Sequence, residues 1–541
     1  GSQQFGVNCN LYAFEDAWLM VDLGMGFADE NLPGIDIILP DLDFVSENKD
    51  KLSGLVITHA HEDHIGAVAH LWPHLRCPIY CTAFTAEILR NKFKEHKDCK
   101  KAVIHEIQAG DHVDIGPFDI EFVHMAHSIP ETVAMYIQTD AGTAFHSADW
   151  NLDPTPVIGK PTDTKKLEAI GKRGVDAYIG DSTNALYPGR AGSEQDVETG
   201  LADALGSCSG KVVITLFASN VARIQSIARA ARKNGRNVAV LGRSLHKMIA
   251  ASKTCGYLKD IPDFILEDDI SLIPDDKLVV IATGSQGEAR AAMARISRGD
   301  WQGVDIGKGD TVIFSSREIP GNEKDIERIK NNLAAAGVSV MSPSDTGHNI
   351  HVSGHPYRDE VYDMLQFLKP KSVIPVHGEF IQLSGQAEVA KGCGITHVQT
   401  PTNGMIIEID KDGLKIAGHV ETGLLAVEPK RIVNVDHAAI RERRKIQQAG
   451  VVLVSIVMDE SGHIASDPQV TLLGLIDEDD PDDADMIDNI LDEIDGIHDD
   501  MTLDERLDDT FAKEQLRIGV RRFVNQLFGY KPITNIHLIR L

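Results

Sequence analysis

Residues 58–66 read THAHEDHIG and follow directly on the apolar stretch 55–57. Three histidines and two carboxylates lie within six residues of this segment. Burying so many imidazoles and carboxylates together is costly unless a positive charge lies among them. The segment therefore predicts a metal-binding turn at the end of a buried strand.

The spacing H-x-H-x-D-H provides two pairs of candidate ligands. His59 and His61 are two residues apart, so in extended backbone their side chains project to the same side. The turn that follows brings Asp63 and His64 back to a second point nearby. This arrangement suits two metal ions about 3.5–4 Å apart, and its ligands favour zinc, with manganese as the alternative metal. The competing interpretation, a surface turn of hydrogen-bonded histidines, requires this spacing to arise by chance.

One turn cannot complete two metal sites, and later strand ends supply further candidates. His127 lies in AHSIP, Asp149 in HSADW and His377 in PVHGE. Each has an ordinary alternative, because a lone histidine often only hydrogen-bonds and an aspartate often forms a turn. Each also follows an apolar strand, however, and strand ends converge to make a site. We interpret His124, three residues before His127, as a non-ligand.

The first part of the chain has the pattern of short strands. Strands are predicted at residues 17–24, 53–60, 118–128 and 132–150, the last as a hairpin. The first of them places Asp22 near its end, and the second leads into the histidine-rich motif. Residues 64–75 have helical spacing with one apolar face.

From about residue 178 the pattern changes to strands that alternate with helices. Strands are predicted at residues 211–219, 237–242, 277–283, 311–316 and 338–343, and helices at 220–233 and 323–336. This alternation implies parallel strands with crossover helices. We therefore expect a separate domain inserted into the first, after which candidate metal-type residues return at His351, His355 and His377.

The last part of the chain predicts a small α+β domain. Residues 450–476 have the pattern of strands, a helix is expected near 503–528, and a short strand ends the sequence. The acidic segment 476–500 lies between them. We interpret that segment as a solvated linker or an interaction surface.

Charge and composition limit the class of protein. The net charge of −28 argues against a general nucleic-acid binder, which is usually basic, although the charge is uneven. The seven cysteines are scattered, which is typical of free thiols in a reducing cytoplasm. We see no run of about 18 apolar residues and no secretory signal at the start of the sequence. We therefore expect a cytoplasmic protein without a membrane span.

Taken together, these motifs resemble the metallo-β-lactamase fold of zinc hydrolases with the β-CASP insertion of its nucleic-acid-processing branch. The match is closest to the bacterial ribonucleases of that branch and covers nearly the whole chain. It rests on Asp22, HAHEDH (59–64), HSIPET (127–132), Asp149, DSTNA (181–185), GSQGE (284–288), HVSGH (351–355) and PVHGE (375–379). One departure is HSADW, where the family more often has Thr-Gly before the aspartate, but the ligand remains in place.

The resemblance implies an α/β fold: a metallo-β-lactamase αββα sandwich, an inserted β-CASP α/β domain and a small α+β C-terminal domain. The boundaries it suggests are 1–180 and 346–425 for the two parts of the sandwich, 181–345 for the β-CASP domain, 426–449 for a linker and 450–541 for the C-terminal domain. The C-terminal domain would mediate self-association into a homodimer or homotetramer; the alternative is that its apolar strands pack only within the domain itself.

The resemblance also implies roles for single residues. One zinc ion would be bound by His59, His61 and His127, and the other by Asp63, His64 and His377, with Asp149 bridging them. Asp22 and Asp181 would orient ligand histidines, as metal sites usually require.

The catalytic group would comprise Asp63, Asp181 and His355, with His355 beside the scissile phosphate as proton donor or transition-state stabiliser. The phosphate at the 5′ end of RNA would be held by Gly284, Ser285, His351, Ser353 and Gly354.

The activity implied is that of a zinc-dependent ribonuclease of RNA decay and maturation, including rRNA processing, within an RNA-decay assembly. It would remove nucleotides from the 5′ end of 5′-monophosphorylated single-stranded RNA, and would cut internally where a strand can thread through. The alternatives are a β-CASP nuclease acting on DNA, a small-molecule hydrolase, and a catalytically silent RNA-binding scaffold. No residue in the sequence separates RNA from DNA as the substrate.

Overall fold

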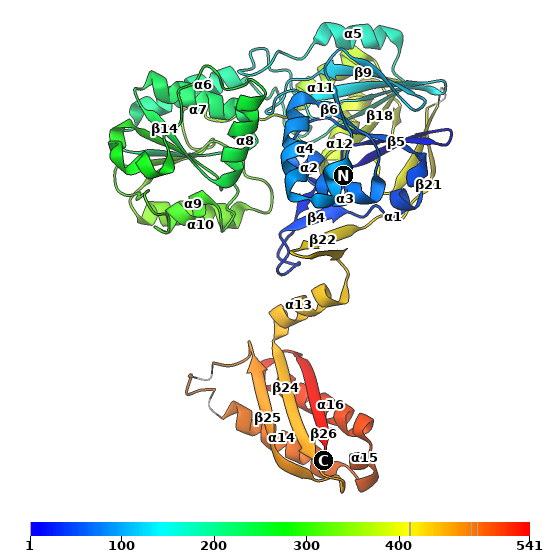
Figure 1. Ribbon diagram of the computed structural model, residues 1–541, viewed down its shortest axis with the longest axis vertical. Coiled ribbons are helices and arrows are strands. Elements are labelled where there is room, and N and C mark those ends of the chain that lie inside the picture. Colours follow the sequence, from blue (N-terminus) through cyan, green and yellow to red (C-terminus); the bar gives the residue numbers. More distant parts are fainter. Residues whose placement is uncertain (1, 411–412, 478, 484) are drawn as a thin grey trace. The chain divides into compact units, whose positions relative to one another are not determined.

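The computed structural model describes residues 2–410, 413–477, 479–483 and 485–541. The chain forms two compact units, one made of residues 1–26 and 39–423 and the other of residues 27–38 and 424–541. Figure 1 shows both units, coloured along the sequence. Among the described residues, no helix combines the length and the apolar character needed to span a bilayer.

Two sheets face each other in the first unit, with strand orders β1-β2-β5-β6-β7 and β19-β18-β12-β11-β10-β9-β8. Apolar side chains that point inward from both sheets, such as Val21, Val56, Phe122 and Ile137, form the core between them. The strands are β1 Asn10–Phe14, β2 Ala17–Val21, β5 Leu52–Ile57, β6 Ile79–Thr82, β7 Ile104–Ile107, β8 His112–Ile115, β9 Phe118–His124, β10 Val133–Thr139, β11 Gly142–His146, β12 Ala177–Asp181, β18 Ser372–Val376 and β19 His397–Val398.

Helices cover the outer faces of this pair of sheets. Leu167, Val361 and Ala390 of three helices pack against the second sheet, and α4 packs against β6 and β7 of the first. The helices are α1 Asp43–Glu47, α2 Glu62–Ile65, α3 Val68–Leu75, α4 Ala83–Glu95, α5 Thr164–Arg173, α11 Arg358–Leu368 and α12 Phe380–Gly392. The αββα sandwich expected from the sequence is confirmed, although α2 and α3 divide the single helix predicted over 64–75. The hairpin of β20 (Met405–Asp410) and β21 (Gly413–His419) follows in the chain.

The inserted domain is built on a parallel sheet of order β14-β15-β13-β16-β17, as the strand and helix alternation predicted. Val213, Val280 and Val312 lie in its core. Its strands are β13 Val212–Thr215, β14 Asn237–Leu241, β15 Leu278–Ala282, β16 Thr311–Phe314 and β17 Ser339–Met341. Its helices are α6 Glu194–Ser207, α7 Val221–Lys233, α8 Arg243–Thr254, α9 Ala292–Ser297 and α10 Glu323–Ala335.

The second unit begins with a small sheet of order β23-β22-β4-β3. Its strands and the following helix are β3 Gly26–Phe27, β4 Ile37–Pro40, β22 Leu424–Glu428, β23 Arg431–Asn434 and α13 Ala438–Ala449. Arg444 of α13 donates a 2.8 Å hydrogen bond to the carbonyl of Asn31, and Ile440 packs against Ile35 and Ala426. The segment 426–449, for which the sequence suggested a linker, therefore contains two strands and a helix.

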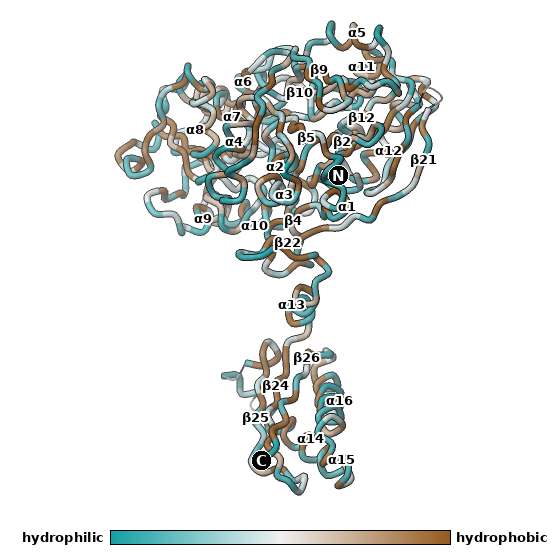
Figure 2. Tube along the Cα trace, turned by 45° about the vertical axis from the view of Figure 1, so that its right-hand side comes forward, coloured by the Kyte–Doolittle hydropathy of each residue, from teal (hydrophilic) through white to brown (hydrophobic). Residues whose placement is uncertain are grey.

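The rest of the second unit is a three-stranded sheet, β25-β24-β26, with three helices. The elements are β24 Val451–Met458, β25 Ile464–Leu473, α14 Met486–Asp500, α15 Leu503–Leu507, α16 Asp509–Phe528 and β26 Ile533–Arg540. The buried residues Ala512, Leu516, Val520 and Val524 recur every four positions along α16. Figure 2 shows the resulting alternation of hydrophobic and hydrophilic residues along this helix, which is typical of a helix with one buried face.

The acidic segment 476–500 differs from the solvated linker expected. Its second half forms α14, in which Ile490 and Ile494 are buried against the sheet while the acidic residues lie on the other side. The apolar residues are four positions apart, so a helix satisfies both kinds of side chain. Glu478 and Ala484 of this segment lie outside the described residues.

Candidate metal centre and active site

Strand ends of both sheets bring the expected metal ligands to one place. The ligand residues lie after β5 (His59, His61), in α2 (Asp63, His64), after β9 (His127), after β11 (Asp149) and after β18 (His377). Three non-glycine residues of this region have positive φ angles: Asp22 (61°), Ala148 (54°) and the ligand residue His377 (58°). Such left-handed backbone is uncommon outside glycine and clusters at functional sites.

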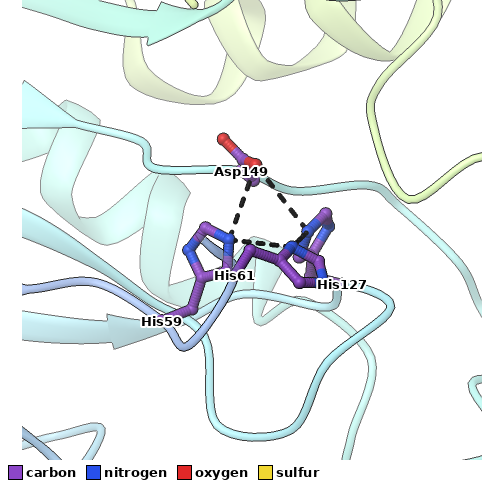
Figure 3. A group of neighbouring side chains, drawn as sticks. All are labelled: His59, His61, His127 and Asp149. Atoms are coloured by element: carbon purple, nitrogen blue, oxygen red, sulfur yellow. Dashed lines mark hydrogen bonds and ion pairs between the residues drawn. The ribbon is translucent and has the colours of Figure 1, made fainter. Parts of the chain in front are cut away.

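The first group of candidate ligands consists of three imidazoles and one carboxylate, which converge in Figure 3. His61 Nδ1 lies 3.1 Å from His59 Nε2 and 3.0 Å from His127 Nε2. Asp149 Oδ2 lies 3.6 Å from His59 Nε2 and 3.8 Å from His127 Nε2. Burial lowers the pKa of His61 to about 3 and that of His127 to about 4. Both rings are therefore neutral at pH 7, which is the form that binds metals.

The second group contains Asp63, His64, Asp149 and His377. His64 Nε2 lies 3.4 Å from Asp63 Oδ2 and 3.2 Å from Asp149 Oδ2. His377 Nε2 lies 3.0 Å from Asp63 Oδ2 and 3.5 Å from Asp149 Oδ1. Residues more than 300 positions apart in the chain thus meet around one point.

Asp149 belongs to both groups of candidate ligands. The groups around its carboxylate show whether the site suits a metal ion. Its side chain is buried, and Oδ2 has no hydrogen-bond partner among the described residues. A buried carboxylate oxygen without a hydrogen bond is costly unless a positive charge lies beside it. The donor set of imidazole nitrogens and carboxylate oxygens matches the ligands that zinc prefers. These residues therefore fit one divalent cation in each group.

Hydrogen bonds behind the ligands hold the histidine rings in place. Asp22 Oδ2 lies 2.7 Å from His64 Nδ1, and the same carboxylate accepts from the backbone N and the hydroxyl of Thr58 at 2.8 and 2.9 Å. Thr183 Oγ1 lies 2.7 Å from His377 Nδ1. Since Nδ1 of each ring faces a partner behind the site, Nε2 of each ring points toward the carboxylates of the second ligand group.

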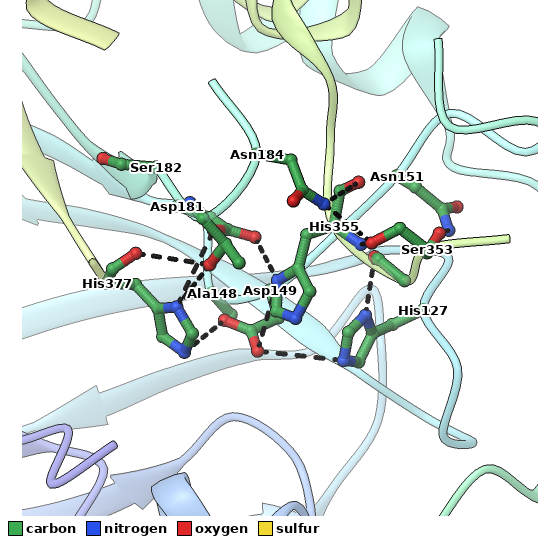
Figure 4. Close-up of polar contacts among 12 residues, drawn as sticks. His127, Ala148, Asp149, Asn151, Asp181, Ser182, Asn184, Ser353, His355 and His377 are labelled. Carbon is green, nitrogen blue, oxygen red and sulfur yellow. Dashed lines mark hydrogen bonds and ion pairs between the residues drawn. The ribbon is translucent and has the colours of Figure 1, made fainter. Parts of the chain in front are cut away.

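His355 lies beside Asp149 and between His127 and His377, one ligand from each group, as Figure 4 shows. Its Nδ1 is 2.8 Å from Asp181 Oδ2 and 3.8 Å from Asp149 Oδ2. Burial lowers the pKa of His355, but Asp181 and Asp149 raise it more, to about 9. Asp181 was expected to orient ligand histidines, yet it lies 3.8 Å from His377 Nδ1. Its shorter contact is therefore with His355.

The loop with the sequence HVSGH (351–355) packs directly against the candidate metal ligands. The carbonyl of Gly354 lies 2.8 Å from His127 Nδ1. A Cβ atom at Gly354 would come within 2.8 Å of the His127 ring, so only glycine fits there. Ser353 Oγ accepts hydrogen bonds from Asn184 Nδ2 at 2.7 Å and from the backbone N of His355 at 3.1 Å.

Arg223 of α7 holds the start of the same loop from the interior. Its fully buried guanidinium donates to both carboxylate oxygens of Glu194, at 2.6 and 2.9 Å. It also donates to the carbonyl of Ser315 at 2.8 Å and lies 3.3 Å from His351 Nδ1. Burial, together with Arg223 and Arg317, lowers the pKa of His351 to about 3. The sequence carries no local signal for this role, because every partner of Arg223 is distant in the chain.

Gly284 and Ser285 lie in the loop after β15, where Gly284 has a φ of 110° and Ser285 is buried. Among the described residues, no hydrogen bond joins either of them to the loop 351–355. The connection runs through other residues: Gln286 donates to the carbonyl of Arg317 at 2.9 Å, and Arg317 donates to Asn184 Oδ1 at 3.1 Å. Sequence reasoning missed Arg317 and Asn184. The available signals were the DSTNA motif around Asn184 and the position of Arg317 just after β16.

Comparison with known proteins defines the class of this fold and site. Four domains match, at residues 33–165 (beta-lactamase superfamily domain), 209–333 (ribonuclease J, beta-CASP domain), 346–401 (Zn-dependent metallo-hydrolase RNA specificity domain) and 438–541 (ribonuclease J C-terminal domain). The chain is therefore a metallo-hydrolase of the β-CASP type, a metal-dependent nuclease.

Two curated relatives match over most of their length. A ribonuclease J of Sinorhizobium meliloti is 39% identical and covers 100% of this chain and 96% of its own. A ribonuclease J 1 of Streptococcus pyogenes is 35% identical and covers 88% of this chain and 85% of its own. The chain belongs to the ribonuclease J family.

One solved structure supports the fold alone. A protein of unknown function from Enterococcus faecalis superimposes with a TM-score of 0.52 at 15% identity, and covers 74% of this chain and 96% of its own.

Proposed function

We propose that this chain hydrolyses the phosphodiester bonds of single-stranded RNA with two zinc ions, or two manganese ions, per subunit. The observation that carries the proposal is the buried Asp149 carboxylate, which lies between two ligand groups and has an oxygen without a donor among the described residues. Membership of the ribonuclease J family supports RNA as the substrate.

One ion would be held by His59, His61 and His127, the other by Asp63, His64 and His377, and Asp149 would bridge them. When bound, the two cations supply the positive charge that activates water and neutralises the oxygens of the phosphate. The protein's own contribution is to fix the ring orientations through the hydrogen bonds of Asp22 and Thr183.

His355 would act as the proton donor. As the oxygen of water bonds to phosphorus, the bond to the 3′ oxygen breaks, and that leaving oxygen needs a proton. Asp181 holds the His355 ring at Nδ1 and favours its charged form. The proton lost by the water would pass to Asp63. The products would be a 5′-monophosphate and a 3′-hydroxyl.

We infer that the 5′ phosphate of the RNA is held by Gly284, Ser285, His351, Ser353 and Gly354. The contact between Gly354 and His127 supports this pocket, because it fixes the loop beside the candidate metal centre. A pocket one nucleotide away from the metal ions would favour 5′-to-3′ removal of single nucleotides from 5′-monophosphorylated RNA. Internal cleavage would follow where a strand can thread past the pocket.

The central experiment uses the full chain and 5′-labelled, monophosphorylated RNA, with and without a chelator. Wild type should release labelled mononucleotides, and the chelator should abolish the reaction. His64→Ala should be inactive, whereas His124→Ala serves as the matched control, because the imidazole of His124 bonds to the carbonyl of Lys160 and takes no part in either ligand group. An unchanged rate in His64→Ala would favour the scaffold interpretation, and faster cleavage of matched single-stranded DNA would favour a DNA nuclease.

A second experiment tests the 5′-phosphate pocket. Ser285→Ala should slow cleavage of 5′-monophosphorylated RNA and leave 5′-hydroxyl RNA nearly unaffected. Equal loss on both substrates would reject the pocket assignment.

We also infer that the protein works in the cytoplasm and self-associates through its C-terminal domain as a homodimer or homotetramer. The seven free cysteines support a reducing compartment. Light scattering of the full chain and of the chain without residues 450–541 would measure the number of subunits in each assembly. The same number of subunits in both would reject the role of this domain.

A further inference from the structure

An acidic enzyme that acts on a polyanion needs a local positive surface, because its overall field repels the substrate. Residues 90–101 and 243–259 carry ten lysines and arginines and only two acidic residues, in a chain with a net charge of −28. We call these two segments together the basic strip. They are separated by more than 140 positions in the sequence.

The two segments of the basic strip are neighbours in the structure. Residues 90–101 comprise the end of α4 and the short helix Lys97–Lys101, and α8 packs against α4. Lys247 of α8 lies 2.6 Å from Glu95 of α4. Several cations of the strip have no ion-pair partner in the described part of the chain, namely Lys94, Lys97, Lys100, Lys101, Arg243 and Lys259. Their charge is therefore available to a ligand.

A surface cavity of about 450 Å³ opens within the strip. Arg90, Lys94 and Lys100 line it, together with the apolar side chains of Phe93 and Ile104. A positively charged groove follows the backbone of single-stranded nucleic acid, so the three cations of this lining suit a chain of phosphates.

Helix α4, which carries part of the strip, contacts segments next to the candidate metal ligands at two points. Lys92 Nζ lies 2.7 Å from both carboxylate oxygens of Glu62, which stands between the expected ligands His61 and Asp63. The backbone N of Phe84, in the first turn of α4, donates a 2.8 Å hydrogen bond to Glu131 in the loop that follows His127. One residue of the strip, Lys92, is therefore paired with the neighbour of two expected metal ligands.

We propose that the basic strip binds the phosphate backbone of the RNA chain outside the metal centre. This inference rests on the proposed function and adds to it the surface that holds the remainder of the substrate. It gives a chain with a net charge of −28 a local surface of unpaired cations that can hold a long anion.

The test compares two variants with equal loss of charge. The strip variant replaces Lys94, Lys97, Lys100 and Lys101 by glutamine. The control variant replaces Lys165, Lys172, Lys308 and Lys324 by glutamine; these lysines are also exposed and also have no ion-pair partner among the described residues. Both are assayed at low salt on a 5′-monophosphorylated RNA of thirty nucleotides and on a trinucleotide.

In the strip variant, the ratio of kcat/KM on the long RNA to that on the trinucleotide should fall at least about tenfold, through KM. The slope of log KM against log salt should become smaller by about 3, which corresponds to four lost phosphate contacts on single-stranded RNA. Metal content and melting temperature should match the control. The same loss in both variants would show a general charge effect and overturn the proposal.

Direct binding separates this proposal from the proposed function. Anisotropy of a labelled thirty-nucleotide RNA, measured with a chelator present, should report weaker binding to the strip variant than to the control, whether or not wild type cleaves RNA. Equal RNA affinity of both variants, with a loss of binding to poly-glutamate only in the strip variant, would identify an acidic peptide as the ligand and reject RNA.

Discussion

Nδ1 of His64 lies 2.7 Å from Oδ2 of Asp22, and both side chains are buried. Asp22 follows β2, whereas His64 lies in α2 beyond the neighbouring strand β5, so this contact joins two strand ends of the first sheet. Because it fixes the ring of an expected ligand, it should control metal affinity rather than the chemical step.

Asp22→Asn should weaken the binding of metal about 10- to 100-fold, since outer-shell partners of ligand histidines have effects of that size. Competition with a chromogenic chelator measures the affinity. Asp16→Asn, a change at an exposed carboxylate, is the matched control. Equal affinities in the two variants would contradict the role given to Asp22.

His355→Gln should lower kcat by about 10²- to 10⁴-fold, because it removes the proposed proton donor. Metal content should remain that of wild type, since His355 is not among the proposed ligands. Stopped assays at saturating RNA, with metal analysis of the same sample, measure both quantities. Loss of metal together with activity would instead identify His355 as a ligand.

Arg223→Met should destabilise the chain by about 3–5 kcal/mol, because Glu194 would keep a buried charge without its partner. The double variant Arg223→Met, Glu194→Met should recover much of this stability. It should not recover activity, since the loop that begins at His351 would still lack its guanidinium donor. Thermal unfolding and RNA cleavage are measured on the same samples, and a double variant as active as wild type would refute the positioning role.

We expect the carboxylate of Glu121 in β9 to make a pH-dependent contribution to the free energy of unfolding. Burial raises the pKa of this carboxyl. The hydrogen bonds from Lys166 and Arg173 lower the pKa by more than burial raises it, so the net shift is downward. A lowered native pKa gives stability that is present above the unfolded pKa of about 4.3 and is lost as the pH falls through the native pKa. The urea midpoint of Glu121→Gln should therefore lie below that of wild type at pH 7. The two midpoints should converge at acidic pH, and a constant difference at every pH would contradict this account.

The sequence alone predicted the parts of the molecule that depend on local pattern. The strand before His59, the hairpin before Asp149 and the alternation of the inserted domain each follow from the periodicity of a single segment. The spacing within HAHEDH predicted ligands at four positions, and the structure brings those side chains to one point with His127, Asp149 and His377.

Features that depend on distant pairing could not be predicted. Residues 27–38 leave the first unit and join residues 424–541, because Ile35 packs with Ala426 and Ile440. The partners of Arg223 lie up to 129 positions away, so no window of sequence contains them. Helix α14 was not predicted, because the high charge of the acidic segment indicated a solvated linker. The four-residue spacing of Ile490 and Ile494 was the signal for a helix with one buried face.

The central claim is that two cations share Asp149. The most direct measurement is diffraction from crystals of the zinc-loaded full chain, with anomalous maps recorded at the zinc edge. The account predicts two peaks, one beside His59, His61 and His127 and the other beside Asp63, His64 and His377, with the Asp149 carboxylate between them. A single peak, or peaks away from Asp149, would contradict it.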